Sequence, residues 1–451
     1  MSQQPILLTD TQLQSYVQNG YIILKSSRPA ELHQQILDKM EAVFEKEGNP
    51  GNNMVPRIPE IQEIFTDPVI HGALTSINGP NYYAHPHRHP HLNRPGSSGQ
   101  NLHKDSWGKL RHHTRWTMTF YYPQDTPVEI GPTGVTPGSQ YLNTGPGEVD
   151  EVPLHGAAGT VVIVHYDLWH RATPNQSDHK RYMLKFLFTR MEEPQPSSWD
   201  QTTSPGSRKT WDTDDPLYSA MWRWHTAKDP QSPRKTNGDG ISIQDLHHQD
   251  EAQAIRAAYQ LSEMGQSAIP DLLSAVRDPD GIARQNATYG LAAMGEAAVD
   301  PVVELIAHED PAVRISGIET LGDLGLDATD ALDQLIKTAG DNNPAIRRAS
   351  TDALGLVGQC STTAASALAE NLKDDDVWVK RNASLALARL GELAEPVTPS
   401  LITALKDENR YVRANSLEAL RRIGTSASET AMFNFLLTSR WCPLTTRDST
   451  F

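Results

Sequence analysis

The chain has 451 residues, of which 38% are hydrophobic and 21% charged, and its formal net charge is −15. It is too long for one ordinary domain, so we expect two or three domains with enough apolar residues for sizeable cores. The acidic excess disfavours nucleic acid as a partner, because phosphate backbones attract basic surfaces. Two cysteines, Cys360 and Cys442, are too few for a disulfide framework or a thiolate zinc site.

No stretch of the sequence approaches the roughly 18 to 20 consecutive apolar residues that a membrane helix needs. The N-terminus, MSQQPILLTDTQLQ, also lacks the basic start and apolar run of a signal peptide. We therefore expect a cytoplasmic protein that does not engage a membrane. Its partner is expected to be a small substrate or another protein.

The first half of the chain mixes helices with later strands. Helices are predicted around TDTQLQSYVQNG, with Thr9 or Asp10 as N-cap and Gly20 as the stop, and around PAELHQQILDKMEAVFEKEG. YIIL then reads as a strand, and the β-branched and aromatic runs RWTMTFYYP, GTVVIVHYDLWH and RYMLKFLFTR follow after residue 100. Short strands flanked by helices predict a double-stranded β-helix, or jelly roll.

A candidate metal site begins at HKD, residues 103 to 105. Residues two apart on a strand share a face, so His103 and Asp105 can bind one ion. The later segment VIVHYDLWH offers His165 or His170 as a third ligand. Two His and one Asp form the facial arrangement of non-haem Fe(II) oxygenases, which leaves metal positions open for co-substrate and oxygen.

Residues 8–226 resemble the phytanoyl-CoA dioxygenase-like Fe(II)/2-oxoglutarate oxygenases, through HKD, IGPTGVTPGSQYL and HYDLWHRATPNQSDHKRYMLKF. The resemblance implies that His103, Asp105 and His170 hold iron. It also implies that Arg181, eleven residues after the last histidine, pairs with the distal carboxylate of 2-oxoglutarate. The expected reaction uses O2 to hydroxylate a small organic substrate. The presence of Asp105 favours hydroxylation over halogenation.

The sequence departs from this family at Ala172, where related proteins often carry a small hydroxyl residue that helps to hold the same carboxylate. Thr173 is the neighbouring candidate for that role. His165 matches a frequent family histidine and is expected to pack near the ligands without binding iron. The glycines and prolines of GPTGVTPGS are expected to shape a turn beside the pocket.

Two other polar segments admit more than one interpretation. His85, His87, His89 and His91 alternate, but they have no accompanying carboxylate or cysteine, and prolines lie between them. We therefore expect them to line the route to the metal and not to form a second metal site. Lys104, Lys109, Arg111, His112, His113 and Arg115 form a basic stretch that either attracts an anionic substrate or is simply solvated.

The C-terminal part repeats itself. Glycines that close similar segments recur every 30 or 33 residues, at Gly265, Gly295, Gly325, Gly358, Gly391 and Gly424. Such a period predicts stacked helix pairs that bury their apolar faces against their neighbours. The array resembles HEAT repeats, in particular the short type known from phycobilin lyases.

Each repeat except the first, which has Ala254 at this position, also carries a basic residue, and an aspartate often lies six residues before it. The pairs are Asp278 with Arg284, Asp341 with Arg347, Asp374 with Lys380, and Asp407 with Arg413. A ladder that binds ligands is one interpretation. We favour an acid–base brace between neighbouring turns, since residues that recur in repeats usually serve stacking.

These patterns predict an oxygenase domain at 1–226, a linker at 227–250, an all-α HEAT-like solenoid at 251–440 and a tail at 441–451. The solenoid is expected to bind a protein or to stabilise the chain. The alternative is a scaffold protein whose oxygenase fold senses 2-oxoglutarate or is inactive.

Overall fold

The computed structural model describes residues 4–106, 110–147, 150–194, 198–200, 213–226 and 240–438. Most of the predicted linker and the whole predicted tail lie outside these residues, so the domain boundaries stay a prediction. The described residues fall into two compact units. One holds residues 4–200 with Trp224, His225 and Thr226, and the other holds Thr213–Arg223 and residues 240–438. No helix within the described ranges is long and apolar enough to cross a membrane.

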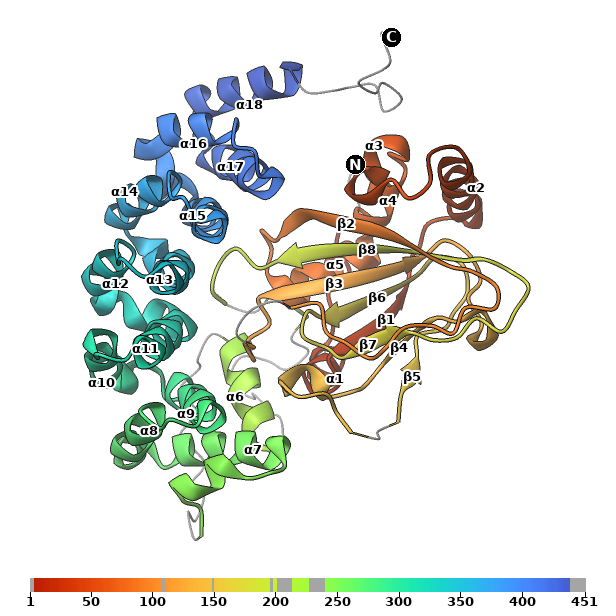
Figure 1. Cartoon of the computed structure of the whole chain (residues 1–451). Coiled ribbons are helices and arrows are strands. Elements are labelled where there is room, and N and C mark those ends of the chain that lie inside the picture. The colour runs from red at the N-terminus through yellow and green to blue at the C-terminus, as the bar shows by residue number, and fades with distance from the viewer. Residues whose placement is uncertain are drawn as a thin grey trace. The chain divides into compact units, whose positions relative to one another are not determined.

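The first unit contains two antiparallel sheets (Figure 1). The larger sheet has the order β1 (Tyr21–Lys25), β6 (Thr160–His165), β3 (Trp116–Tyr122), β8 (Arg181–Thr189) and β2 (Tyr83–Asn93). The smaller sheet has the order β5 (Val152–Pro153), β4 (Thr133–Val135) and β7 (His170–Ala172). The prediction of a β-rich jelly-roll unit with flanking helices is confirmed.

An apolar core fills the space between the sheets. Met118, Phe120 and Tyr122 of β3 contact Val135 of β4, Leu154 and residues of β6 and β8 within one buried cluster. Because strand side chains alternate between faces, Met183 and Leu187 of β8 share this inner face with Arg181 and Lys185. The inner face therefore carries two basic residues among apolar ones.

Helices cover the outer face of the large sheet. They are α1 (Asp10–Asn19), α2 (Ala30–Glu47), α3 (Met54–Arg57), α4 (Ile61–Phe65) and α5 (Pro68–Asn78). Phe65 of α4 packs on Phe186 and Phe188, and Phe44 of α2 packs on Tyr182. The even-numbered residues of β8 thus face the helices, which leaves the odd-numbered ones for the interior.

The first helix begins and ends where the sequence predicts. Thr9 forms a capping box with Gln12, and Gly20 ends the helix with a φ of 79°. A Cβ at Gly20 would lie 2.4 Å from Oε1 of Gln140. Both the left-handed backbone and this close approach require glycine.

The second unit is a stack of helix pairs (Figure 1). After α6 (Pro216–His225), it comprises α7 (Glu251–Glu263), α8 (Ile269–Val276), α9 (Gly281–Ala293), α10 (Val299–Val303), α11 (Pro311–Leu324), α12 (Leu332–Thr338), α13 (Pro344–Val357), α14 (Thr362–Asn371), α15 (Val377–Leu390), α16 (Thr398–Ala404), α17 (Arg410–Ile423) and α18 (Ser426–Thr438). Helices α9, α11, α13, α15 and α17 pack in succession. Each starts at an Asp or Asn cap, as in Asp310 and Asn343, where a proline follows. The predicted helical solenoid is confirmed.

The recurring basic residues brace the repeats, although their partners differ from the predicted ones. Arg347 donates through Nη1 to the backbone carbonyl of Asp341, six residues earlier, at 2.9 Å. Its Nε and Nη2 instead bind the carboxylate of Asp374, in the following repeat, at 2.7 and 2.9 Å. Arg314 with Asp341 and Lys380 with Asp407 repeat the second contact. Arg314, Arg347 and Lys380 therefore each join their own repeat to the following one.

Candidate metal centre

Backbone pairing brings the two histidines of the candidate site together. His103 and His170 form an isolated antiparallel bridge, with N–H to O distances of 3.0 and 2.8 Å, and their ring centroids lie 4.6 Å apart. Asp105 follows in extended chain that is not part of a strand. The predicted strand around HKD is therefore reduced to one bridge residue, but the expected convergence with β7 is present.

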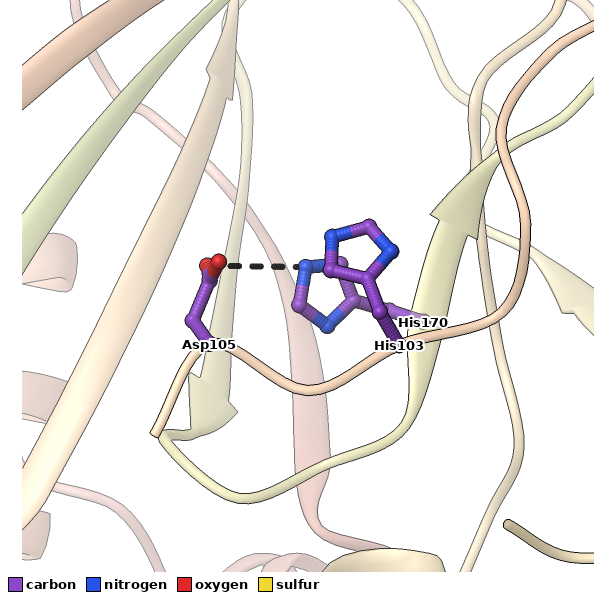
Figure 2. A group of neighbouring side chains, drawn as sticks. All are labelled: His103, Asp105 and His170. Atoms are coloured by element: carbon purple, nitrogen blue, oxygen red, sulfur yellow. Dashed lines mark ion pairs between the residues drawn. The ribbon is translucent and has the colours of Figure 1, made fainter. Parts of the chain in front are cut away.

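The three predicted ligands lie close enough to share one ion. Their ligand atoms all lie within 4.8 Å of one another, and Nε2 of His170 is 3.6 Å from Oδ2 of Asp105 (Figure 2). This is the one group of three or more potential metal ligands found in the described part of the chain. The group can bind a metal.

Hydrogen bonds orient both imidazoles. Nδ1 of His103 lies 2.9 Å from the carbonyl of Asn101, and Nδ1 of His170 lies 2.9 Å from the carbonyl of Leu168. A proton on each Nδ1 satisfies these carbonyls and leaves the Nε2 lone pairs for a cation. The two rings are thus held in the tautomer that a metal requires.

Burial and charge also favour the metal-binding protonation states. Burial lowers the pKa of His170 to about 4, so the ring is neutral at pH 7. Burial pushes the pKa of Asp105 upward, but Lys185 and His170 outweigh it and lower that pKa overall. The site therefore offers a neutral imidazole beside an ionised carboxylate.

Lys185 is a site residue that the motifs did not reveal. Its Nζ lies 2.8 Å from Oδ2 of Asp105, and the residue is 8% exposed. It lies four residues after Arg181 on the same face of β8. Alternation along RYMLKFLFTR was the signal that could have found it.

Arg181 lies inside the domain with part of its hydrogen-bonding capacity unused. It is 1% exposed, and its Nε donates to the carbonyl of Gly131 at 3.0 Å. Its Nη1 is buried with no hydrogen-bond partner among the described residues. Gly131 has a φ of 75°, and a Cβ there would lie 2.4 Å from Nδ2 of Asn93, so this turn requires glycine.

The hydroxyl groups near Arg181 are arranged differently from the expectation. The Thr173 hydroxyl donates to the carbonyl of Pro132 at 2.7 Å, so its proton is already used, and its predicted role with 2-oxoglutarate stays a prediction. Tyr122 Oη instead accepts from the backbone N–H of Thr133 at 3.1 Å. Thr133 lies directly opposite Ala172 in the β4–β7 pair. A tyrosine hydroxyl therefore lies near the position where Ala172 lacks one.

Comparison with known proteins agrees with these features. Residues 16–183 match the family model described as phytanoyl-CoA dioxygenase (PhyH), and residues 299–388 match the model of HEAT repeats. The chain joins a PhyH domain to HEAT repeats. A search of curated proteins found no match.

Several solved structures are similar to parts of the chain. The non-heme alpha ketoglutarate dependent carbocyclase SnoK from nogalamycin biosynthesis is 19% identical, with a TM-score of 0.35, over 42% of this chain and 88% of SnoK. The epimerase SnoN from the same biosynthesis is 16% identical, with a TM-score of 0.35, over 41% and 83%. The CpcE and CpcF complex of phycocyanin lyase from Nostoc sp. PCC7120 is 27% identical, with a TM-score of 0.31, over 34% and 98%.

Other polar residues of the PhyH domain have structural partners. Arg115 from the basic stretch is buried and binds Glu193 at 3.0 Å, so it is held inside the domain. His113 stacks on Trp224 with ring centroids 4.7 Å apart. Lys109 lies outside the described residues. The basic stretch is therefore in part structural, and an anion-binding role for it has no support from Arg115.

The other histidines singled out in the sequence lie outside the metal group, and the expectation that the alternating ones line the route to the metal stays a prediction. His165 is buried beside Asp167, whose backbone N–H donates to its Nδ1 at 3.2 Å, and it is not part of the metal group. His85 packs on Trp116, and His89 and His91 lie 5.1 Å apart by ring centroids. The alternating histidines form no metal group within the described residues.

Proposed function

We propose that the chain is an Fe(II)- and 2-oxoglutarate-dependent dioxygenase that hydroxylates a small organic substrate. The observation that carries this proposal is a metal-binding group of three residues, accompanied by a buried arginine, Arg181, whose Nη1 has no hydrogen-bond partner among the described residues. The HEAT repeats would serve protein interaction or stabilisation.

The donor set fits Fe(II). Two imidazoles and one carboxylate supply three ligands, which leaves positions on the metal for a chelating co-substrate and for O2. His103, Asp105 and His170 would hold the ion. When bound, Fe(II) would supply the redox chemistry that couples oxidation of 2-oxoglutarate to oxidation of the substrate.

Arg181 fits the distal carboxylate of 2-oxoglutarate. A buried guanidinium with an unbonded N–H is costly, on the order of 1–3 kcal/mol or more for a charged group. A carboxylate aligned with its Nη atoms would supply the missing acceptor, and charge-assisted pairs of this kind are stronger than neutral hydrogen bonds. The arginine thus supports recognition of a dicarboxylate co-substrate.

Tyr122 fits the second contact to the same carboxylate. Phe120 lies opposite Lys185 in the β3–β8 pair, so alternation places Tyr122 on the inner face with Arg181. Because its oxygen accepts from Thr133, its own proton remains available to donate. We infer that this hydroxyl replaces the one missing at Ala172.

The test is a titration of 2-oxoglutarate into the full chain loaded anaerobically with Fe(II). Wild type should bind saturably, and Tyr122→Phe should weaken the affinity about tenfold, as expected for one hydrogen bond to a charged group. Tyr121→Phe is the matched control. It removes the neighbouring hydroxyl, which faces the helices and lies 2.8 Å from Nδ1 of His33, and should leave the affinity unchanged.

Two outcomes would change this assignment. Wild type that fails to bind 2-oxoglutarate in the presence of Fe(II) would refute the proposed co-substrate. Saturable binding without succinate release, in air and across candidate substrates, would instead support the alternative of a 2-oxoglutarate sensor.

A further inference from the structure

Lys185 and His91 lie on the inner face beside the metal-binding group, and the proposed contacts to 2-oxoglutarate use neither. In the β2–β8 pair, His89 lies opposite Lys185 and His91 lies opposite Met183. Opposite residues of antiparallel strands point to the same face. His91 therefore shares the face of β8 that carries Lys185 and Arg181.

Both side chains have hydrogen-bonding capacity that the described residues do not use. An ammonium has three donors, and Lys185 makes its one described contact with Asp105. Nε2 of His91 is buried with no hydrogen-bond partner among the described residues. Buried polar atoms of this kind are usually bonded to protein, water or ligand.

His91 is also electrostatically coupled to this group. Burial first, and then the charges of Lys185, His89 and Arg181, lower its pKa to about 3. The ring is therefore neutral at pH 7 and offers one N–H donor and one acceptor. A neutral donor beside an ammonium suits an oxygen-rich anion.

The charges around the site are unbalanced once the proposed ligands are counted. Arg181 and Lys185 are buried cations, and Asp105 is the one carboxylate that binds Lys185 within the described residues. In the proposed function, a distal carboxylate neutralises Arg181 and the metal takes Asp105. Lys185 then lacks a full counter-charge, which is unfavourable for a buried ammonium.

We propose that Lys185 and His91 form a subsite that binds an anionic group, a carboxylate or a phosphate, of the substrate to be oxidised. The assignment rests on the proposed function, because the metal is what draws Asp105 away from Lys185. Substrates that carry an acid group are then preferred to their neutral amides or esters. The preference for anions is then attributed to Lys185 and His91 on the inner face of the sheet and not to Arg115.

The test measures anion binding to the full chain, anaerobically loaded with Fe(II) and 2-oxoglutarate in chloride-free buffer. The probes are acetate and inorganic phosphate, with acetamide as the neutral control, and the readout is the thermal unfolding midpoint against probe concentration. At least one of the two anions should bind saturably to wild type, and acetamide should not. Lys185→Gln should weaken that binding at least tenfold, whereas Lys185→Arg should largely restore it.

Lys180→Gln is the matched control, because it removes the same charge from an exposed lysine just before β8. It should leave anion binding unchanged. In Lys185→Gln the affinity for the anion should fall more than the affinity for 2-oxoglutarate, whose distal carboxylate is assigned to Arg181. The anionic group that Lys185 binds is then assigned to the substrate and not to 2-oxoglutarate.

Three results would overturn the proposal. The first is no saturable anion binding to wild type, and the second is undiminished binding to Lys185→Gln. The third is a tenfold loss of 2-oxoglutarate affinity in Lys185→Gln, which would assign Lys185 to the co-substrate. Failure of the proposed function looks different, since wild type would then not bind 2-oxoglutarate at all.

Discussion

Two arginines, Arg347 and Arg181, serve opposite purposes in the two units. Arg347 of the HEAT repeats uses Nε and both Nη atoms, bonding to the Asp374 carboxylate and to backbone carbonyls. Arg181 of the PhyH domain makes one described bond through Nε, while its Nη1 is buried and unbonded. The completed set of bonds marks Arg347 as a residue that holds the fold, and the incomplete set of Arg181, in the domain that also carries the metal-binding group, is consistent with a ligand.

The same contrast appears in the carboxylates. Burial raises the pKa of Asp374, but its bonds to Arg347 and to the backbone outweigh burial and lower the pKa overall. Asp167 of the PhyH domain is also buried, but its polar and charged neighbours offset burial only in part, so its pKa rises to about 6. The repeats therefore gain stability from their charges, whereas the PhyH domain holds a charge that is unfavourable for folding.

The largest expected effect is the loss of 2-oxoglutarate affinity in Arg181→Gln, with Arg347→Gln for comparison. Arg181→Gln should weaken 2-oxoglutarate binding about 100-fold, because it removes a charge-assisted pair of about 3 kcal/mol. Arg347→Gln should leave that affinity within twofold of wild type. Calorimetric titration of both variants in the presence of Fe(II) checks this, and equal losses in the two would contradict the contrast.

Asp167→Asn should stabilise the protein near neutral pH. In wild type the folded pKa of about 6 exceeds the ordinary aspartate value of 3.8, so stability falls as pH rises through this window. The variant should gain roughly 2–3 kcal/mol at pH 7, and the gain should vanish below about pH 4. Denaturant unfolding at both pH values measures it, and a gain that does not depend on pH would show that the charge is not the cause.

Arg347→Gln should destabilise the repeats by about 1–2 kcal/mol. The pair with Asp374 is bidentate and mostly buried, so it exceeds an ordinary surface ion pair. Loss of helical circular dichroism in urea reports the change. Arg410→Gln is a suitable control, since this exposed arginine contacts the neighbouring Tyr411. A loss of stability in Arg410→Gln as large as that in Arg347→Gln would argue against the brace.

The smallest effect is expected at Thr173. Its hydroxyl proton is donated to Pro132, so Thr173→Val should change 2-oxoglutarate affinity less than about threefold. The same titration used for Tyr122→Phe measures this. A tenfold loss would mean that Thr173 turns toward the co-substrate and would restore it as the second contact.

What the sequence predicted depends on how local the signal is. The capped helix at Thr9 and the repeat period follow from short motifs and spacing, whereas the choice of His103, Asp105 and His170 as candidate ligands came from the resemblance to a family. Alternation from Arg181 along β8 could have found Lys185, whereas Tyr122 needed the strand register, because it shares the face of Arg181 only through the pairing of β8 and β3. The partner of Arg347 is 27 residues away, so the sequence indicated a brace but not its second carboxylate.

The most direct test of the account is the visible charge-transfer band that a 2-oxoglutarate chelate of Fe(II) produces in the absence of oxygen. Wild type should show the band on addition of both ligands, and His170→Ala should lose it while keeping the circular dichroism of the folded chain. No band in wild type, or an equal band in His170→Ala, would contradict the assignment of His103, Asp105 and His170 to one metal.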